Sequence, residues 1–548
     1  MRQAHDVLLL IVDDLRADLG CYGRRWARTP HIDALSSRSA TFLQAHASVA
    51  NCAPSRASLM TGLRPDTHGV LDLKTHIRDR HHGVVTLPQR FRQAGYLAVS
   101  YGKIFHQFLD DAASWSGQDE WPDNHTYRGL RGGAWGRAGG WSRGWRYNQY
   151  MLPQHVAAQE ATARRRRSGD WSVSVNGAVP PYEVGLGEAA ACRGDGRRQR
   201  RRGTPACRPE YTDERIARLG VRALRMLMSQ PSRRWLLALG FVRPHLPFNV
   251  PQQFWDGAVD AQGGASDASD ASASDGSVAA ATGLSRLTAA HLGGGDGELY
   301  DFQTKRRVLA ASPHGRALGR AYGAAVSFVD SLVGTVLDAV RARGGDNRTI
   351  VALFSDHGWK LGHHGDHWGK HTLMGDDTHV PLLIAVPGWR PRRVHAPVEL
   401  IDLYPTLLAL TRLAPPRGSG APPLEGQSLV PLMRRRQRAA PRAFLARAAA
   451  FSQWPMHTPH RCMGYAVRTQ GWLLIQWAAD RHQSPPPTDA DAASCGAHAD
   501  LFKVRRNASR EGVLREVPTP IARHPHVAAS LRRRLWRVLR VRAPDHGG

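Results

Sequence analysis

The sequence predicts an α/β fold with a large mixed, mostly parallel sheet between helices, followed by a smaller C-terminal α+β subdomain with an antiparallel sheet. Three observations lead to this prediction. Short apolar runs typical of buried parallel strands recur along the chain, helical patterns separate them, and a pair of strand-like runs follows near the C-terminus. Alternating strands and helices are typical of a sheet covered on both faces.

The apolar runs are short enough to be strands and too apolar to face water. They lie at residues 7–12, 97–100, 235–241, 350–354 and 382–386. Because they lack alternating polar residues, we expect fully buried strands of a parallel sheet.

Helical patterns fall between these runs. Residues 29–35 form one candidate helix, and residues 321–342 form a long one. In the long segment the apolar residues recur at steps of three and four, and they are Tyr322, Val326, Val329, Val333, Val336 and Val340. This spacing places them on one helix face, which predicts packing against the sheet.

Two regions interrupt the pattern. Residues 256–295 are rich in Asp, Ala, Ser and Gly, so we expect a flexible insertion that buries too little apolar surface to become ordered. Residues 114–208 carry many Gly, Trp and Arg residues, which predicts long surface loops.

The C-terminal part has a different pattern. The runs 464–468 and 472–477 predict two paired antiparallel strands, and the spacing of Val527, Leu531, Leu535 and Val538 predicts a closing helix with a basic outer face. We place the boundary near residue 435, which gives a large first domain at 1–435 and a smaller subdomain at 436–548.

Composition narrows the class of protein. The chain has 548 residues, of which 42% are hydrophobic, and no uncharged apolar run approaches the roughly 20 residues that span a bilayer. We therefore expect no membrane span. The formal charge of +28 favours anionic partners. Much of it lies in arginine runs at 164–167, 197–202, 434–436 and 532–534, which fit solvated loops or basic helix faces as well as binding sites.

The chain has six cysteines and three Asn-X-Ser/Thr sequons, the latter at Asn124, Asn347 and Asn507. A disulfide could join Cys192 to Cys207, and another could join Cys462 to Cys495, although free thiols fit the second pair equally well. These features favour a lysosomal or secreted protein. No signal peptide is visible, because the first apolar run has only six residues and leads into Asp13.

Acidic residues follow two of the predicted strands directly. Asp13 and Asp14 follow the first run, and Asp356 and His357 come just after the run at 350–354. Because the carboxyl ends of parallel strands meet at one sheet edge, these groups could hold a hard divalent cation. Taken alone, the Asp13-Asp14 pair would more often be a helix N-cap, and the triplet at 356–358 would be a similarly weak signal.

The segment from Cys52 to Gly62, Cys-Ala-Pro-Ser-Arg-Ala-Ser-Leu-Met-Thr-Gly, is the most specific motif in the chain. Together with the strand-end acids it resembles the ordered signature of type I sulfatases, and most closely their iduronate-2-sulfatase branch. Further segments carry the same resemblance, and they lie at 10–16, 29–33, 101–106, 243–248, 355–358, 378–382 and 463–469.

The resemblance implies an alkaline-phosphatase-like sandwich and a specific chemistry. Cys52 would be converted to formylglycine by a formylglycine-generating enzyme, and one hydroxyl of the aldehyde hydrate would attack sulfur while the other later releases sulfate. One Ca²⁺ would be held by Asp13, Asp14, Asp356, His357 and the modified Cys52. His357 is an unusual ligand for so hard an ion.

The resemblance also implies catalytic roles for five further residues. Arg56, four residues after Cys52 and on the same helix face, would hold the hydrate. Lys103 and His106 would orient the nucleophile and the sulfate oxygens. His245 and Lys370 would contact sulfate and the leaving-group oxygen, one of them as general acid, with His371 nearby for substrate recognition. Without the resemblance, these residues would fit ordinary surface or structural positions.

The chain departs from the family pattern around the expected substrate pocket. His363 stands where the family usually has an acid, Asp366-His367 adds a residue before Trp368, and Leu373-Met374-Gly375 replaces a polar and aromatic pair. These differences affect the predicted substrate more than the predicted reaction.

We therefore expect a sulfatase that removes 2-O-sulfate from uronate units of a heparan or dermatan sulfate-like polysaccharide. Its partners would be that sulfated polysaccharide and the maturation enzyme, with no nucleic acid expected. Two alternatives stay open. One is a phosphodiesterase or phosphonate hydrolase of the same superfamily, and the other is a non-catalytic polyanion-binding homologue.

Overall fold

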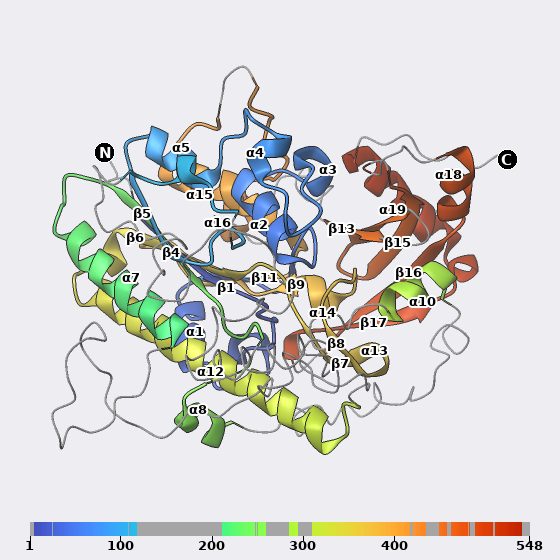
Figure 1. The fold of residues 1–548 in the computed structure, drawn as a ribbon, viewed down its shortest axis with the longest axis horizontal. Helices are drawn as coiled ribbons and strands as arrows, with labels where there is room; N and C mark the ends of the chain where they lie inside the picture. The colour runs from blue at the N-terminus through green and yellow to red at the C-terminus, as the bar shows by residue number, and fades with distance from the viewer. Residues whose placement is uncertain are drawn as a thin grey trace, which may run out of the picture.

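A computed structural model shows two regions, a large α/β region and a smaller C-terminal region built on its own sheet (Figure 1). The described residues are 5–24, 26–107, 109–117, 211–246, 248, 250–258, 284–293, 309–416, 420–434, 449–456, 462–480, 482, 488–507 and 510–539. The arginine runs at 164–167 and 197–202, the Cys192 and Cys207 pair and Asn124 lie outside them, as does the predicted boundary at 435.

The centre of the α/β region is a seven-stranded mixed sheet with the order β11-β2-β10-β6-β1-β5-β4. Its strands are β1 (Asp6–Val12), β2 (Ala40–Phe42), β4 (Leu97–Gly102), β5 (Trp235–Phe241), β6 (Thr349–Ser355), β10 (Leu382–Ala385) and β11 (Arg392–Val394). β6, β1, β5 and β4 are mutually parallel. All five predicted strands are present.

One of these strands runs in the unexpected direction. β10, predicted at 382–386 as a parallel strand, pairs antiparallel with β6 and with β2. It is fully buried like its neighbours. Burial on both faces produces the continuous apolar run in either direction, so composition could not reveal the orientation.

Helices cover both faces of this sheet, as Figure 1 shows. Successive residues of β1 point to opposite faces, with Leu8 and Leu10 in one apolar core and Val7 and Leu9 in the other. The first core includes α1 (Pro30–Ser36), α7 (Thr212–Met228) and α12 (Pro313–Arg341), and the second includes α2 (Cys52–Thr61), α5 (Leu87–Gln93), α15 (Leu403–Thr411) and α16 (Val430–Arg434).

The long helix α12 confirms the predicted apolar face, because all six residues of that face are buried. Among the described helices it is the one long and apolar enough to cross a membrane, and 72% of that stretch is buried inside the protein. It therefore has the burial expected of a core helix.

Short helices and strands complete the α/β region. The helices are α3 (Pro65–His68), α4 (Ile77–Arg80), α8 (Gln252–Asp256), α13 (His363–Asp366) and α14 (Gly375–Thr378). The strands are β3 (Ala45–His46), β9 (His379–Val380) and β12 (Val398–Glu399) in one small sheet and β7 (Lys360–Gly362) with β8 (His367–Gly369) in another.

The C-terminal region is a five-stranded antiparallel sheet in simple sequential order. Its strands are β13 (Ala450–Met456), β14 (Cys462–Arg468), β15 (Trp472–Ala479), β16 (Ala499–Asn507) and β17 (Arg510–Thr519). One face packs on α10 (Arg286–Gly293) and α18 (Asp489–Gly496), and the other packs on α19 (Pro525–Leu539). The predicted strand pair and closing helix are confirmed, with Leu531 and Leu535 buried.

The prediction of a flexible insertion over the whole of 256–295 is wrong at its C-terminal end. Residues 286–293 form α10, and Leu287 and Leu292 are buried in the core beside the C-terminal sheet. Ser285 also donates a hydrogen bond to Asp500 of β16 at 2.6 Å. Two leucines in a polar stretch are too few to predict a helix from the sequence. The segment becomes helical because these leucines pack against the C-terminal sheet, whose residues are far away in the chain.

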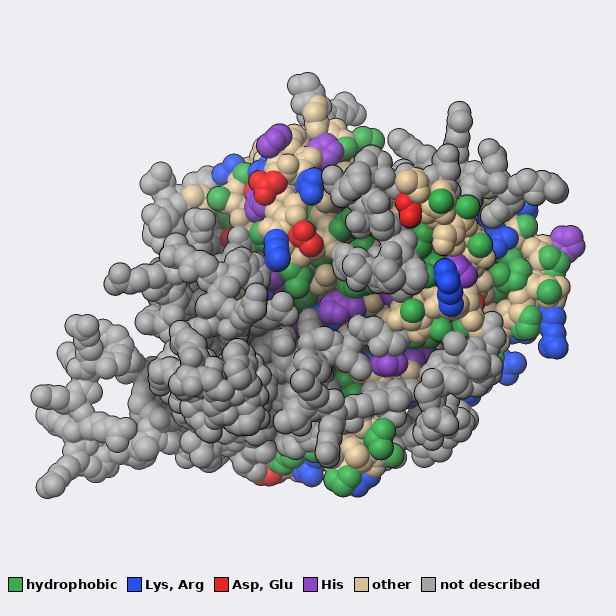
Figure 2. All heavy atoms as spheres, turned by 45° about the vertical axis from the view of Figure 1, so that its right-hand side comes forward, with side chains coloured by type: hydrophobic (Ala, Val, Ile, Leu, Met, Phe, Trp, Pro, Cys, Tyr) green, Lys and Arg blue, Asp and Glu red, His purple; other side chains and the backbone are tan. Residues whose placement is uncertain are grey.

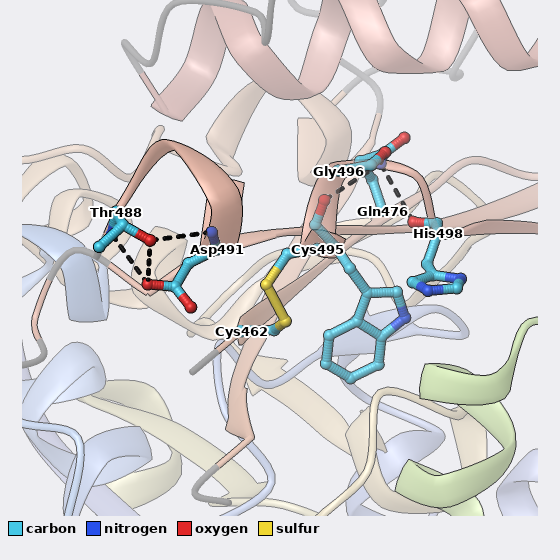
Figure 3. Close-up of a disulfide and its surroundings, with 8 residues drawn as sticks. Cys462, Gln476, Thr488, Asp491, Cys495, Gly496 and His498 are labelled. Atoms are coloured by element: carbon cyan, nitrogen blue, oxygen red, sulfur yellow. Dashed lines mark hydrogen bonds between the residues drawn. A yellow bond between two sulfur atoms is a disulfide. The ribbon is translucent and has the colours of Figure 1, made fainter. Parts of the chain in front are cut away.

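Cys462 and Cys495 form a disulfide that joins β14 to α18, with a Cα–Cα distance of 5.7 Å (Figure 3). Thr488 caps α18 by accepting from the backbone N–H of Asp491. The side-chain amide of Gln476 donates to the carbonyl oxygens of Gly496, the last residue of the helix, and of His498 just beyond it. The second predicted pair is thus confirmed.

Candidate active site

The predicted acidic groups meet at one edge of the central sheet. β1 and β6 are parallel neighbours, with Val12 opposite Ser355, so Asp13 and Asp14 lie beside Asp356 and His357. All four side chains are buried. Asp14 adopts a left-handed backbone conformation with φ 59°, and its carbonyl oxygen accepts from the hydroxyl of Tyr322 on α12 at 2.7 Å. Tyr322 of α12 therefore fixes the turn that follows β1.

Cys52 is the first residue of α2, and its buried side chain points into this group of charges. Its Sγ atom lies 3.3 Å from Nε2 of His357 and 3.7 Å from Oδ1 of Asp13. The Nζ atoms of Lys103 and Lys370 each lie 3.5 Å from the same sulfur. Four segments distant in sequence thus converge on one side chain.

Arg56 lies one helical turn after Cys52 and ties the two acidic strand ends together. Its Nε atom is 2.8 Å from Asp356 and its Nη2 atom is 2.9 Å from Asp13. Nη1 donates to the carbonyl oxygen of Ile104 at 3.1 Å. With 1% exposure, Arg56 is a buried clamp and forms no surface ion pair.

The two lysines neutralise the remaining carboxylate charge. Lys103 pairs with Asp13, and Lys370 pairs with Asp14 at 2.8 Å. Lys103 follows β4 through Gly102, where φ is +82° and a Cβ atom would lie 2.2 Å from the carbonyl oxygen of Gly240. The turn requires glycine, and it directs the lysine inward.

The pKa values of the two neighbouring aspartates are shifted in opposite directions. Burial raises the pKa of both, but the positive charges of Lys103 and Arg56 hold the pKa of Asp13 well below its usual range. Burial dominates at Asp14, whose pKa is raised despite Lys370. Burial, with Asp13 nearby, also raises the pKa of the Cys52 thiol to about 12. A thiol in this position is protonated at neutral pH.

The ligand atoms of Asp13, Cys52, Asp356 and His357 lie within 4.8 Å of one another. A second such group contains Asp14, Cys52 and His245. Four of the five predicted metal ligands thus form one cluster, and Asp14 joins it through Cys52. The Oδ2 atom of Asp14 is buried and has no hydrogen-bond partner among the described residues. A cation would satisfy this oxygen.

The predicted histidines lie around this cluster at different distances. His245 comes after β5, and its Nε2 atom is 3.9 Å from Oδ2 of Asp14. His106 is buried, and its Nδ1 atom has no hydrogen-bond partner within the described part of the chain. Burial and nearby lysines lower the pKa of both histidines. Histidine side chains also gather near the centre of one face of the molecule (Figure 2).

His371 follows Lys370 and has a left-handed backbone with φ 85°. Its ring is 5.0 Å from the ring of Trp454 on β13, with an interplanar angle of 34°. The C-terminal sheet therefore supplies a side chain next to the site. Sequence analysis missed Trp454, because a tryptophan in a strand ordinarily indicates core packing and no local motif surrounds it.

The region where the chain departs from the family pattern forms a separate polar cluster. Nε2 of His364 is 2.8 Å from Asp376, and Nε2 of His363 is 3.7 Å from it. Arg16 contacts the same carboxylate at 3.1 Å. The histidine at 363 thus faces an acid on α14.

Comparisons with known proteins agree with this geometry. Residues 5–413 match the family named Sulfatase. Human iduronate 2-sulfatase is 28% identical over 533 residues, covering 86% of this chain and 85% of that protein.

Two solved structures share the fold. A phosphonate monoester hydrolase from Silicibacter pomeroyi is 21% identical, with a TM-score of 0.60 and coverage of 99% of this chain and 96% of its own. A putative sulfatase from Bacteroides fragilis is 16% identical, with a TM-score of 0.62 and coverage of 99% and 97%. The expected alkaline-phosphatase-like fold is confirmed, and this chain belongs to the sulfatase family of sulfuric ester hydrolases.

Proposed function

We propose that the enzyme removes 2-O-sulfate from uronate residues of a heparan or dermatan sulfate-like polysaccharide, with formylglycine at position 52 and one bound Ca²⁺. The supporting observation is the convergence on the Cys52 side chain. Nitrogen atoms of three residues lie within 3.5 Å of Sγ, namely Lys103, His357 and Lys370. Such an arrangement suits a group that carries oxygen atoms better than a protonated thiol.

The residues present fit a calcium ion. Three buried carboxylates from Asp13, Asp14 and Asp356 offer the oxygen ligands that Ca²⁺ prefers, and residue 52 and His357 would complete its coordination. When all three are ionised, their negative charges are matched by the positive charges of Arg56, Lys103 and Lys370. Adding a dication would therefore leave an excess of positive charge, and this suits an anionic sulfate ester. When bound, Ca²⁺ would polarise the sulfuryl oxygens.

Formylglycine would supply the nucleophile, since its hydrate carries two hydroxyl groups on one carbon. Arg56 would orient that group, because its guanidinium is already held by Asp13 and Asp356 on one side of the helix turn. Lys103 and Lys370 would bind sulfate oxygens and withdraw charge from them as the ester bond breaks. His106 would line the same pocket beside Lys103.

His245 is our candidate for the general acid. Its Nδ1 atom is 2.7 Å from the carbonyl oxygen of Leu246, which can only accept, so Nδ1 carries a proton. The other nitrogen, Nε2, faces Asp14 and the site. As the general acid, Nε2 would donate a proton to the departing sugar oxygen.

Two observations support the proposed substrate, namely the similarity to iduronate 2-sulfatase and a pair of aromatic side chains beside the site. The rings of His371 and Trp454 contact each other in a tilted arrangement next to Lys370, where a sugar ring attached to the reacting sulfate would lie. We also propose a lysosomal or secreted location, which the disulfide between Cys462 and Cys495 supports. Maturation there would require a formylglycine-generating enzyme.

Two measurements test the proposal together. Mass spectrometry of the peptide that contains residue 52 should show formylglycine in active protein, and an unmodified thiol in active protein would contradict the mechanism. Sulfate release should be measured with a 2-O-sulfated uronate disaccharide and an aryl sulfate, alongside an aryl phosphodiester and a phosphonate monoester. We expect turnover of the sulfates. Faster cleavage of the phosphorus esters would favour the hydrolase alternative, and no turnover with undiminished heparin binding would favour a binding protein.

A further inference from the structure

A second pocket lies at the junction of the catalytic and C-terminal regions, and none of the catalytic residues line it. Its cavity volume is about 580 Å³, within the range of small-molecule sites. The lining residues come from the loop after α2, from residues 423–426, from the start of β13 and from α19, and they are Arg64, Pro423, Leu424, Glu425, Gly426, Ala449, Phe451, Arg534, Arg537 and Val538.

This pocket is separate from the active site. Cys52 is at the N-terminal end of α2, whereas Arg64 comes three residues after its C-terminal end. A helix of that length spans about 15 Å. The guanidinium of Arg64 is bound by Glu399 and lies 5.4 Å from the centre of the Phe451 ring. Because its charge is already paired with Glu399, Arg64 contributes to the pocket lining.

Helix α19 supplies two positively charged side chains to the pocket. Arg534 and Arg537 are three residues apart and line the same pocket. Neither forms a salt bridge with any residue in the described part of the chain, whereas Arg532 on the same helix donates to Gln476 at 2.9 Å. Glu425 contributes one carboxylate, which accepts from the backbone N–H of Arg64 at 2.6 Å. Two guanidinium groups that have no ion-pair partner among the described residues thus line the pocket.

We infer that this pocket is a secondary binding site for an anionic sugar unit of the polysaccharide substrate, with Arg534 and Arg537 binding its carboxylate or sulfate. Guanidinium groups suit these planar or tetrahedral oxyanions, because they can donate two parallel hydrogen bonds. Leu424, Phe451 and Val538 supply apolar surface for the ring of the same sugar. This inference rests on the proposed substrate class and gives the basic closing helix a function.

The test compares two double variants that remove equal charge from the same end of the chain. Arg534→Gln with Arg537→Gln alters the pocket, while Arg523→Gln with Arg533→Gln removes two exposed arginines that do not line it. Glutamine keeps part of each aliphatic stem, so packing of α19 should survive. Thermal unfolding of each variant checks this.

We expect the pocket variant to raise KM about tenfold for long heparan or dermatan sulfate oligosaccharides, a change of roughly 1.4 kcal/mol. KM for a sulfated disaccharide and for an aryl sulfate should stay unchanged, since neither reaches both sites. The control variant should match the parent protein with every substrate. Equal effects of the two variants, or an effect that is independent of oligosaccharide length, would overturn the inference.

Binding gives a readout that does not depend on turnover. With Cys52→Ala in all proteins, calorimetric titration with the same long oligosaccharides at physiological ionic strength should show weaker binding for the pocket variant alone. If the parent protein released no sulfate from any ester, the proposed function would fail, and this binding difference would still decide whether the pocket holds an anionic sugar.

Discussion

Cysteines at the two sheets of this protein have opposite environments. Cys52 lies among lysines, an arginine and carboxylates at the edge of the central sheet, whereas Cys462 and Cys495 are buried with Leu473, Ile475 and Phe502 beside the C-terminal sheet. Cys52 is a free thiol, and the other two form a disulfide. The first environment provides polar partners for chemistry on the side chain, and the second protects a covalent link.

The same contrast holds for stability. At the central edge, each buried charge depends on a partner of opposite sign, as Arg56 does on Asp13 and Asp356. Removing one partner leaves another buried and uncompensated, which is costly. In the C-terminal region, apolar burial on both faces of the sheet and one cross-link contribute to stability, beside one buried ion pair between Arg468 and Glu516. Substitutions at the edge of the central sheet should therefore mainly reduce activity. Substitutions in the C-terminal region should mainly reduce the stability of the fold.

The largest effect is expected at Cys52. Cys52→Ala removes the proposed nucleophile, so kcat/KM for an aryl sulfate should fall by at least ~10⁴-fold. Cys21→Ala is the matched control, because Cys21 is also a free thiol but lies outside the charged cluster. Sulfate release and thermal unfolding should be measured for both. Activity of Cys52→Ala near that of Cys21→Ala would show that residue 52 is not the nucleophile.

The disulfide should affect folding without affecting chemistry. Replacing Cys462 and Cys495 with serine opens a link between residues 33 apart in sequence, so the free energy of unfolding should fall by about 2–5 kcal/mol. Denaturant titration measures this loss. At a temperature where the variant is folded, kcat for an aryl sulfate should equal that of the parent protein, and a large fall in kcat would contradict the division between the two regions.

Acid should destabilise the junction of the two regions through His291. Burial lowers its pKa from 6.5 to about 3, so the unfolded chain binds more protons than the folded protein below pH 6.5. Stability is therefore retained above pH 6.5 and falls as pH decreases toward 3, by about 2 kcal/mol at pH 5 for this one group.

His291→Gln keeps an acceptor for the backbone N–H of Leu373, which His291 binds at 3.1 Å. Between pH 7 and pH 5 this variant should lose about 2 kcal/mol less stability than the parent protein. Urea titrations at both pH values measure the difference. His82→Gln, at an exposed position, is the control, and an equal acid response of both variants would rule out His291 as a cause.

The smallest effect is expected at Trp454, where the C-terminal region borders the active site. Trp454→Ala should raise KM for a 2-O-sulfated uronate disaccharide about fivefold, as expected for the loss of one aromatic contact of about 1 kcal/mol. Turnover of a small aryl sulfate should change less. The control is Trp472→Ala, whose ring packs against His524 instead. Identical KM values for Trp454→Ala and the parent protein would restrict Trp454 to a structural role.

Local pattern was sufficient for much of the fold and part of the site. The six apolar positions of α12 and the strands β1, β4, β5 and β6 follow from periodicity and burial. The placement of Asp13 and Asp356 follows from parallel strands ending at one edge. For Lys103, His245 and Lys370 the resemblance was needed, since a single lysine or histidine in a loop has no distinctive local pattern.

The sequence by itself determined most of the elements, because periodicity acts within one helix or strand, and its resemblance to a family motif led to the proposal of Cys52 as the nucleophile. Only the tertiary structure decided the direction of β10, the ordering of α10 and the place of Trp454 beside His371. Each of these depends on a surface contributed by residues far away in the chain. The balance of three carboxylates by Arg56, Lys103 and Lys370 has the same origin, since opposite charges are buried together only after folding.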